Sequence, residues 1–229
     1  QPMIGNYIQC GMEEFMKAIF WEGDIEQNFI GHQCSEIWRD RIYAPFVEGK
    51  NGDVCIDIGA NLGLTSLYFS KYFKIVHSIE PSIEHFEVLT HMIEYNKLVN
   101  VIPHKLAIWL KEKELPLFHN PNRTMFSLHM AVDAKQEAPE KVLAIPLDKF
   151  FDDNKIEHCD FLKMDIEGTE FEVLGSSGFR KVAPKINTIV GEYHEWAQRN
   201  PNQIRQALEN NGFKFGTIPS DAKLFVGTK

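Results

Sequence analysis

The sequence predicts an α/β fold, a doubly wound sheet whose parallel strands are covered by helices on both faces. A mainly apolar run at residues 54–58 leads into a turn that begins at Gly59 and ends at Gly63, and a helical pattern follows. Short apolar runs and helical patterns continue to alternate over much of the chain. With 229 residues and 44% hydrophobic content, the chain is long enough to bury the core of one ordinary domain.

The first strand and its turn occupy residues 53–65, Asp-Val-Cys-Ile-Asp-Ile-Gly-Ala-Asn-Leu-Gly-Leu-Thr, after the turn signal Asn51-Gly52. The apolar run before the glycines is typical of a central strand in a sheet covered on both faces. We expect Gly59 to let the backbone turn sharply and approach a ligand. Gly63 should let the first turn of the next helix sit close to the strand.

The glycine spacing and a nearby carboxylate indicate which nucleotide this turn binds. The dinucleotide fingerprint Gly-x-Gly-x-x-Gly needs its second glycine where this chain has Asn61. Asp57 lies at the carboxyl end of the strand, where it would repel a pyrophosphate and attract a cation. S-Adenosylmethionine carries an ammonium and a sulfonium and no phosphate, so the sequence favours it over a nicotinamide dinucleotide. A nicotinamide-dependent oxidoreductase is the alternative.

A second acidic residue follows the next strand, at residues 75–79. Glu80 lies 23 residues after Asp57, where a carboxylate can accept both ribose hydroxyls of a nucleoside. The other interpretation is that Asp57 is a helix cap and Glu80 a solvated strand end. Pro81 and Ser82 start a helix with Ser82 as N-cap, and we expect His85 on its surface. The predicted cofactor-binding residues are Asp57, Gly59, Ala60, Asn61, Gly63, Glu80, Pro81 and Ser82.

Three segments together resemble the FkbM family of S-adenosylmethionine-dependent methyltransferases. They are Asp57-Ile-Gly-Ala-Asn-Leu-Gly63, Glu80-Pro-Ser82 and Leu162-Lys-Met-Asp-Ile-Glu-Gly-Thr-Glu-Phe-Glu-Val-Leu174, and the resemblance covers about residues 50–195. It implies a Rossmann-like class I methyltransferase sheet, mostly parallel with an antiparallel last strand. It also implies methyl transfer to an oxygen, often a hydroxyl of a sugar or natural product.

We expect a single methyltransferase domain over residues 1–229, with an N-terminal helical cap at 1–50 and an S-adenosylmethionine-binding α/β core at 51–229. The cap is rich in large apolar residues, and a helix is expected at 35–46. This segment either forms a lid over the cofactor or simply packs onto the core.

Net charge and hydropathy indicate which kinds of substrate and which cellular location to expect. A net charge of −8 argues against a nucleic-acid backbone as substrate, because phosphate binding needs a basic face. No stretch approaches the length of a membrane span, and no signal peptide opens the sequence, so we expect a cytoplasmic protein. The expected acceptor is a small-molecule or saccharide hydroxyl. The sequence does not indicate the oligomeric state, and a noncatalytic S-adenosylmethionine-binding protein is a further alternative.

The segment at residues 106–145 interrupts the alternation of strands and helices. Runs at 107–110 and 115–118 suggest a hairpin, and 142–145 suggests another strand. An excursion of this length usually builds substrate recognition or a lid. Its polar candidates are Arg123, Ser127 and His129.

The catalytic candidates follow the fourth and fifth parallel strands, expected at 159–164 and 185–191. Asp165 ends the former, and Glu192 and His194 follow the latter, so these side chains should converge in the crevice beside Asp57. Thr169-x-x-Glu172 matches a capping box for the helix between them. Two runs, 213–217 and 224–227, should close the sheet as a hairpin.

Methyl transfer to an alcohol needs help in removing the hydroxyl proton, and two arrangements can provide it. His194 could act as general base, with Glu167 or Glu192 orienting its other nitrogen. Alternatively, Asp165, Glu192 and His194 could hold a divalent ion, Mg²⁺ or Mn²⁺, that acidifies the hydroxyl. The structural interpretation is that Glu167 and Glu170 cap a helix and His194 hydrogen-bonds a loop.

Overall fold

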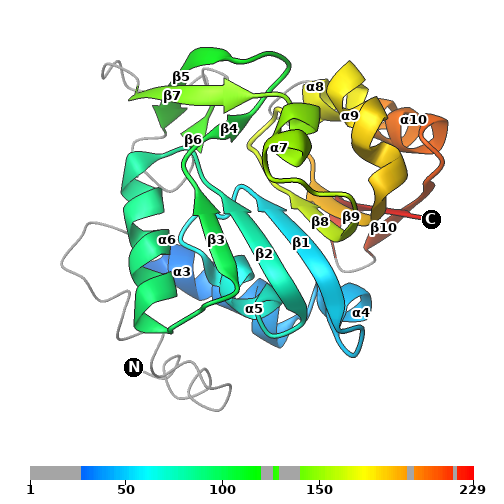
Figure 1. Ribbon diagram of the computed structural model, residues 1–229. Coiled ribbons are helices and arrows are strands. Elements are labelled where there is room, and N and C mark those ends of the chain that lie inside the picture. The colour runs from blue at the N-terminus through cyan, green and yellow to red at the C-terminus, as the bar shows by residue number, and fades with distance from the viewer. Residues whose placement is uncertain (1–26, 120–125, 129–139, 195–198, 219–220) are drawn as a thin grey trace.

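The computed structural model describes residues 27–119, 126–128, 140–194, 199–218 and 221–229. A seven-stranded sheet lies at its centre, with the strand order β10-β11-β9-β8-β1-β2-β3 (Figure 1). The strands are β1 (Gly52–Ile58), β2 (Phe73–Ile79), β3 (Val101–His104), β8 (Cys159–Met164), β9 (Ile186–Glu192), β10 (Lys214–Ile218) and β11 (Asp221–Thr228). β3, β2, β1, β8 and β9 pair in parallel, whereas β11 is antiparallel to both β9 and β10. The predicted mostly parallel sheet with an antiparallel last strand is therefore confirmed.

Helices cover both faces of this sheet (Figure 1). One face carries α3 (Gln27–Cys34), the π-helical turn η1 (Ser35–Arg39), α4 (Ala44–Val47), α5 (Leu64–Phe69) and α6 (Ile83–Tyr95). The other face carries α7 (Leu147–Asp153), α8 (Glu170–Gly175), α9 (Ser177–Val182) and α10 (Asn202–Asn210), and the short 3₁₀ turn η2 (Ala183–Lys185) precedes β9. The arrangement is the predicted doubly wound fold.

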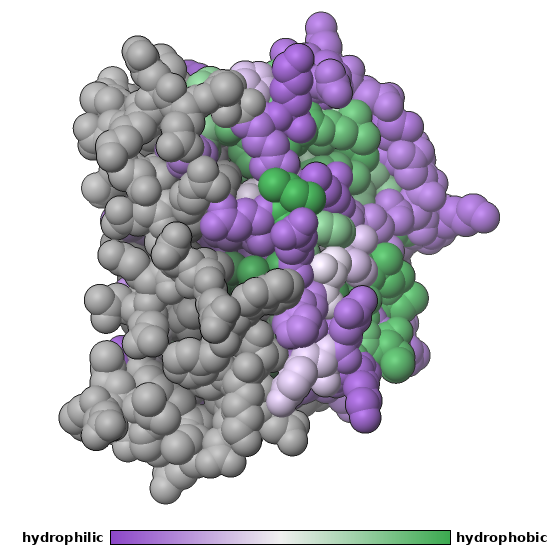
Figure 2. Space-filling model, turned by 90° about the vertical axis from the view of Figure 1, so that its left-hand side faces the viewer, coloured by the Kyte–Doolittle hydropathy of each residue, from purple (hydrophilic) through white to green (hydrophobic). Residues whose placement is uncertain are grey.

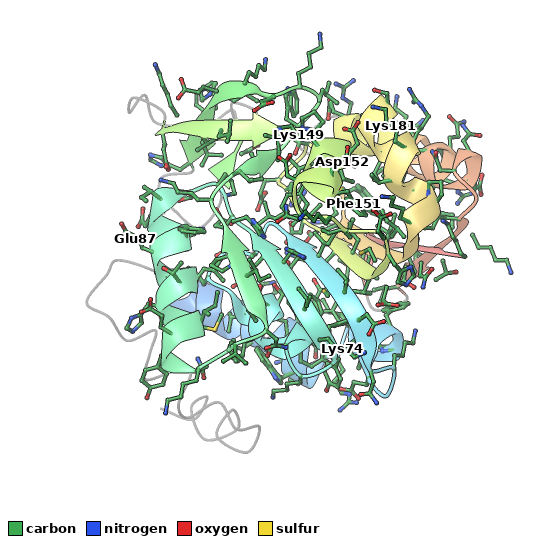
Figure 3. The ribbon with its side chains drawn as sticks, viewed as in Figure 1. Lys74, Glu87, Lys149, Phe151, Asp152 and Lys181 are labelled. Atoms are coloured by element: carbon green, nitrogen blue, oxygen red, sulfur yellow. The ribbon has the colours of Figure 1, made fainter. Side chains whose placement is uncertain are left out.

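The central strand β1 contributes to the hydrophobic cores on both faces. Cys55 packs into the core under α3, α5 and α6, and Ile56 and Ile58 pack into the core under α7 to α10. On α7, Phe150 and Phe151 are fully buried, and Figure 3 shows Phe151 on the inner side of that helix. A strand buried on both faces explains why residues 54–58 are almost continuously apolar.

The described part of the N-terminal segment does not form the single helix expected at 35–46. It forms α3, η1 and α4 in succession, and Ser35 donates to the carbonyl of Gly31 at 2.8 Å instead of capping a helix. Cys34, Ile37 and Val47 are buried in the core. Packing onto the core is therefore one role of residues 34–47.

The excursion after β3 forms a small second sheet with the order β4-β7-β5-β6. Its strands are β4 (Ala107–Ile108), β5 (Lys113–His119), β6 (Phe126–Ser127) and β7 (Glu140–Ile145). The predicted hairpin between the runs at 107–110 and 115–118 is wrong, because β7 lies between β4 and β5 and pairs with both. Glu140 of β7 accepts hydrogen bonds from the backbone N–H of Ile83 at 3.1 Å. This contact attaches the small sheet to the N-terminus of α6.

Two local predictions about helices also need correction. Ser82 does cap α6, but His85 is buried rather than on the surface. Thr169 precedes α8 without capping it, because its hydroxyl donates to the carbonyl of Ile166 at 3.1 Å. The helix then breaks at Ser176, which caps α9 by accepting from the N–H of Phe179 at 3.0 Å.

The coloured part of the face in Figure 2 shows hydrophilic and hydrophobic side chains intermixed. Within the described stretches, every helix is too short or too polar to cross a bilayer.

Candidate active site

The glycine turn after β1 is fixed between the tips of β2 and β8. Gly59 has φ 77°, and a Cβ atom there would lie 1.8 Å from the backbone oxygen of Asp165. The N–H groups of Gly59 and Ala60 both donate to the carbonyl of Ile79 at the end of β2, at 3.0 and 2.9 Å. A glycine is required at 59 because the turn presses against the β8 tip, rather than because a ligand alone approaches it.

The second glycine, Gly63, permits a different packing contact from the one that we expected. Gly63 has φ 91°, and a Cβ there would meet the side chains of Leu89 and Met92 on α6 at 2.7 and 2.3 Å. Gly63 therefore allows α5 and α6 to pack closely, whereas we expected close packing of α5 against β1.

Glu80 connects the glycine turn with the start of α6. One carboxylate oxygen accepts from the N–H of Asn61 and the other from the N–H of Ser82, both at 2.9 Å. Burial raises the pKa of Glu80 to about 7, although the two N–H donors oppose this shift. A carboxylate has about four lone-pair sites, so two backbone bonds leave capacity for further hydroxyl donors.

A cleft with about 570 Å³ of space, partly open to solvent, lies beside Glu80. Its polar rim comes from the tips of β1, β2 and β8 and includes Asn61, Glu80, Asp165 and Glu167. Its apolar wall comes from Pro81 and from the small sheet that follows β3. That wall contains Leu106, Ala107, Ile108, Leu117 and Leu128. The excursion therefore builds one side of the cleft.

A second cavity also borders the glycine turn, with about 340 Å³ of space that is partly open to solvent. It shares Gly59, Asn61 and Asp165 with the first cleft, so the two adjoin at these residues. Its remaining lining comes from the N-terminal segment, α5 and β8. Those residues are Gln33, Glu36, Ile37, Ile42, Tyr43, Ala60, Leu64, Thr65 and Lys163.

We expected Asp57 to face the ligand crevice, but it is not among the residues that line either cavity. It is fully buried, and one carboxylate oxygen accepts hydrogen bonds from the hydroxyls of Thr65 and Ser66 at 2.6 and 2.7 Å. The other oxygen lies 3.3 Å from the ammonium of Lys163. The position of Asp57 thus differs from that of a residue in direct contact with a bound cation.

Lys163 links these groups, and we did not identify it from the sequence. It is 3% exposed, donates to the carbonyl of Gly59 at 2.6 Å and lies 3.6 Å from a carboxylate oxygen of Asp165. Burial opposes its charge, but Asp57 and Asp165 outweigh burial and raise its pKa. A signal was present in the sequence, because a lysine inside an apolar parallel strand needs a buried partner.

His194 lies in a cluster of carboxylates beyond the first cleft. Its Nε2 atom is 3.2 Å from Glu167 Oε2 and 3.8 Å from Asp165 Oδ1, and its Nδ1 atom is 3.2 Å from Glu170 Oε1. Both ring nitrogens therefore face carboxylates. Burial opposes protonation, but these carboxylates raise the pKa of His194 to about 10.

The two glutamates of this cluster come from the turn after β8, which contains Glu167, and from the first residue of α8, Glu170. Glu167 has φ 51°, and its carbonyl accepts from the hydroxyl of Ser127 at 2.6 Å. Burial raises the pKa of the Glu167 carboxyl to about 8, although His194 opposes this shift. Glu170 is fully buried and accepts from the N–H of Ile166 at 2.8 Å. Glu170 thus supports both the turn and the imidazole.

The predicted metal set differs from the grouping in the structure. Among the described residues, Asp165, Glu170 and His194 place one ligand atom each within 4.8 Å of one another. Glu192, which we expected in this set, ends β9 and acts on the cluster through its charge, which contributes to the raised pKa of Glu167. Glu170 takes its place because the tight turn after Asp165 returns α8 toward His194. Arg123 and His129 lie outside the described residues.

The fold is the doubly wound, mostly parallel α/β fold of the class I methyltransferase type. The model of the FkbM methyltransferase domain matches residues 57–215, and the chain belongs to this family. S-Adenosylmethionine is the cofactor that the family implies. This assignment does not favour the nicotinamide-dependent oxidoreductase or the noncatalytic protein.

Two relatives illustrate the assignment. The chain is 27% identical over 221 residues to "Methyltransferase sdnD" of Sordaria araneosa, with 82% of this chain and 83% of that protein covered. The crystal structure of the methyltransferase FkbM from Methylobacillus flagellatus KT is similar in fold, with a TM-score of 0.56 and 15% identity. That comparison covers 88% of this chain and 52% of the other, so this chain spans about half the length of that structure.

Proposed function

We propose that this protein transfers a methyl group from S-adenosylmethionine to a hydroxyl oxygen of a small molecule or saccharide. The observation that carries this proposal is the position of the acid cluster. Asp165 and Glu167 line the same cleft as Glu80, and Glu167 is paired with a buried imidazole. The residues to which we assign nucleoside binding and proton acceptance, Glu80 and Glu167, thus line one cleft.

The first cleft supports binding of the adenosine part of the cofactor. Ribose hydroxyls would donate to Glu80, whose two backbone hydrogen bonds fix the carboxylate in place. The apolar wall, formed by Pro81 and the residues of the small sheet, would cover the adenine ring. The sulfonium would then lie toward Asp165, because this residue borders both cavities.

The reaction needs an aligned acceptor oxygen and a group that takes its proton. In the transfer, the oxygen forms a bond to the methyl carbon as the carbon–sulfur bond breaks and its electrons return to sulfur. We assign the proton to Glu167, because it lines the cleft and its pKa is raised. His194 was our expected base, but both its nitrogens face carboxylates. Its role in the proposal is to hold Glu167 and to balance the negative charge.

A divalent ion held by this cluster is the alternative to a general base. Asp165, Glu170 and His194 have the donor atoms for such an ion, and the mixed oxygen and nitrogen set suits Mn²⁺ better than Mg²⁺. A metal would acidify the acceptor hydroxyl in place of a base. Chelation separates the two arrangements. We expect full activity in EDTA; activity lost in EDTA and restored by a divalent ion would favour the metal.

The proposed function can be tested with isotopically labelled S-adenosylmethionine. We would incubate the protein with a panel of saccharides and hydroxylated metabolites, and locate the labelled methyl group by mass spectrometry and NMR. Glu167→Gln, which removes the proposed proton acceptor, is the control for background methylation. A methyl ether is the expected product. Label found mainly on nitrogen, carbon or a protein side chain would overturn the proposal.

A further inference from the structure

The second cavity contains polar groups that the proposed reaction does not use. Gln33 on α3 and Glu36 on η1 are three residues apart and both line this cavity. The side-chain oxygen of Gln33 is shielded from solvent, and among the described residues it has no hydrogen-bond partner. A buried amide oxygen without a donor is costly, which indicates that a donor is supplied by a ligand.

The charges around this cavity favour a cationic group. The carboxylates of Glu36 and Asp165 contribute to its lining together with the Gln33 amide. Lys163 also lines it, but the ammonium of Lys163 is already paired with Asp57 and with the carbonyl of Gly59. Glu36 Oε1 already lies 3.3 Å from His32 Nε2, so the acceptor that lacks a donor among the described residues is the side-chain oxygen of Gln33. The carboxylates of Glu36 and Asp165 add negative charge to the same lining, which favours a donor that carries a positive charge, such as an ammonium group.

The position of the second cavity indicates which cationic ligand would reach it. Its lining shares Gly59, Asn61 and Asp165 with that of the first cleft, so a ligand that passes these residues from an adenosine beside Glu80 would reach Gln33. S-Adenosylmethionine carries a short amino-acid chain with an ammonium group beyond the sulfur. A ligand that occupied only the first cleft would leave Gln33 without its donor.

We propose that Gln33 and Glu36 bind the ammonium group of S-adenosylmethionine, which makes α3 and η1 part of the cofactor site. This inference rests on the proposed function, because it takes S-adenosylmethionine as the methyl donor. It gives the N-terminal segment a role beyond packing. The π-helical turn at Ser35–Arg39 lies between Gln33 and the start of α4, and turns of this kind often occur at functional sites.

The test compares two ligands that differ only in the amino-acid end. S-Adenosylhomocysteine has the amino-acid chain, and 5′-methylthioadenosine has the same adenosine and thioether without it. We would measure both affinities by calorimetry. Gln33→Leu should weaken S-adenosylhomocysteine at least about tenfold, because it removes a hydrogen bond to a charged group, and should leave 5′-methylthioadenosine unchanged. Glu36→Gln should weaken the same ligand selectively.

A conservative variant and a matched control make the test specific. Gln33→Glu keeps an acceptor oxygen and should bind S-adenosylhomocysteine at least as well as the wild type. Gln203→Leu makes the same change on the exposed side of α10 and should affect neither ligand. If Gln33→Leu does not fold, Glu36→Gln and Gln33→Glu still decide the question by the same comparison.

Two outcomes would overturn the inference. One is unchanged affinity for S-adenosylhomocysteine in folded Gln33→Leu and Glu36→Gln. The other is an equal loss for both ligands in these variants. Either result would leave the proposed function intact if the wild type still binds S-adenosylhomocysteine. A wild type that binds neither ligand would instead contradict the proposed function itself.

Discussion

At the residue scale, the chemistry of the site depends on where the proton between His194 and Glu167 lies. The two side chains are 3.2 Å apart, and the other nitrogen of the imidazole faces Glu170 at the same distance. A carboxylate on each side stabilises the protonated ring, so a neutral His194 that could act as base is disfavoured. Glu167 then becomes the group that accepts a proton from a bound hydroxyl.

Glu167→Gln should lower turnover by about 10²-fold with little change in cofactor affinity, because it removes the proton acceptor and keeps the shape of the side chain. Steady-state kinetics with a saturating cofactor measures this effect. Glu157→Gln is the control, since Glu157 is largely exposed and its partner is Lys185. Near-normal turnover in Glu167→Gln would show that another group takes the proton.

At the scale of elements, the site depends on how closely the tips of β1 and β8 approach. Gly59→Ala places a side chain at a positive φ and directly against the backbone of Asp165. We expect a loss of unfolding free energy of at least about 2 kcal/mol, from backbone strain and the clash together. Gly175→Ala is the matched control, because nothing lies within 4 Å of a Cβ there. Equal midpoints for the two variants in urea unfolding would contradict this description of the turn.

The pairing of β2 with β3 brings two histidines into contact. His77 Nδ1 and His104 Nε2 are 3.0 Å apart, and the rings stack beside Phe150. Burial lowers the pKa of both imidazoles, that of His104 to about 4, with the charge of His77 as a second cause. The folded protein therefore keeps this pair neutral at a pH where the unfolded chain binds protons.

Stability from this pair should be complete above about pH 6.5 and be lost as the pH falls toward 4, because the unfolded state takes up protons first. His104→Gln removes one titrating group. It should reduce the loss of unfolding free energy between pH 7 and pH 5 by about 1 kcal/mol, a value lowered for solvent screening. The same slope in His104→Gln and wild type would contradict the expectation.

At the scale of the whole molecule, the parts that the sequence predicted well are those with a local pattern. The buried β1 strand, the Ser82 cap and the closing hairpin of β10 and β11 follow from apolar runs and turn residues. The pairing in the small sheet was predicted wrongly, because β7 inserts between two runs that are close in sequence.

Several site residues could not be predicted for a similar reason. The role of Glu170 depends on a turn that returns α8 toward His194, and no local pattern reports that contact. The burial of Asp57 depends on Lys163, which is its neighbour across the β1–β8 pair and lies more than a hundred residues away in the chain. The Gln33 and Glu36 contributions depend on how the N-terminal segment packs against the glycine turn.

We expect S-adenosylmethionine to bind at the tips of β1, β2 and β8 with its ribose on Glu80. Calorimetric titration of S-adenosylhomocysteine into wild type and Glu80→Ala tests it most directly. The loss of hydrogen bonds to a charged group should weaken binding by about 1.5–3 kcal/mol, roughly one to two decades in affinity. Circular dichroism would establish that the variant is folded, because Glu80 also holds the N–H groups of Asn61 and Ser82. An unchanged affinity in folded Glu80→Ala, or no binding by the wild type, would contradict the claim.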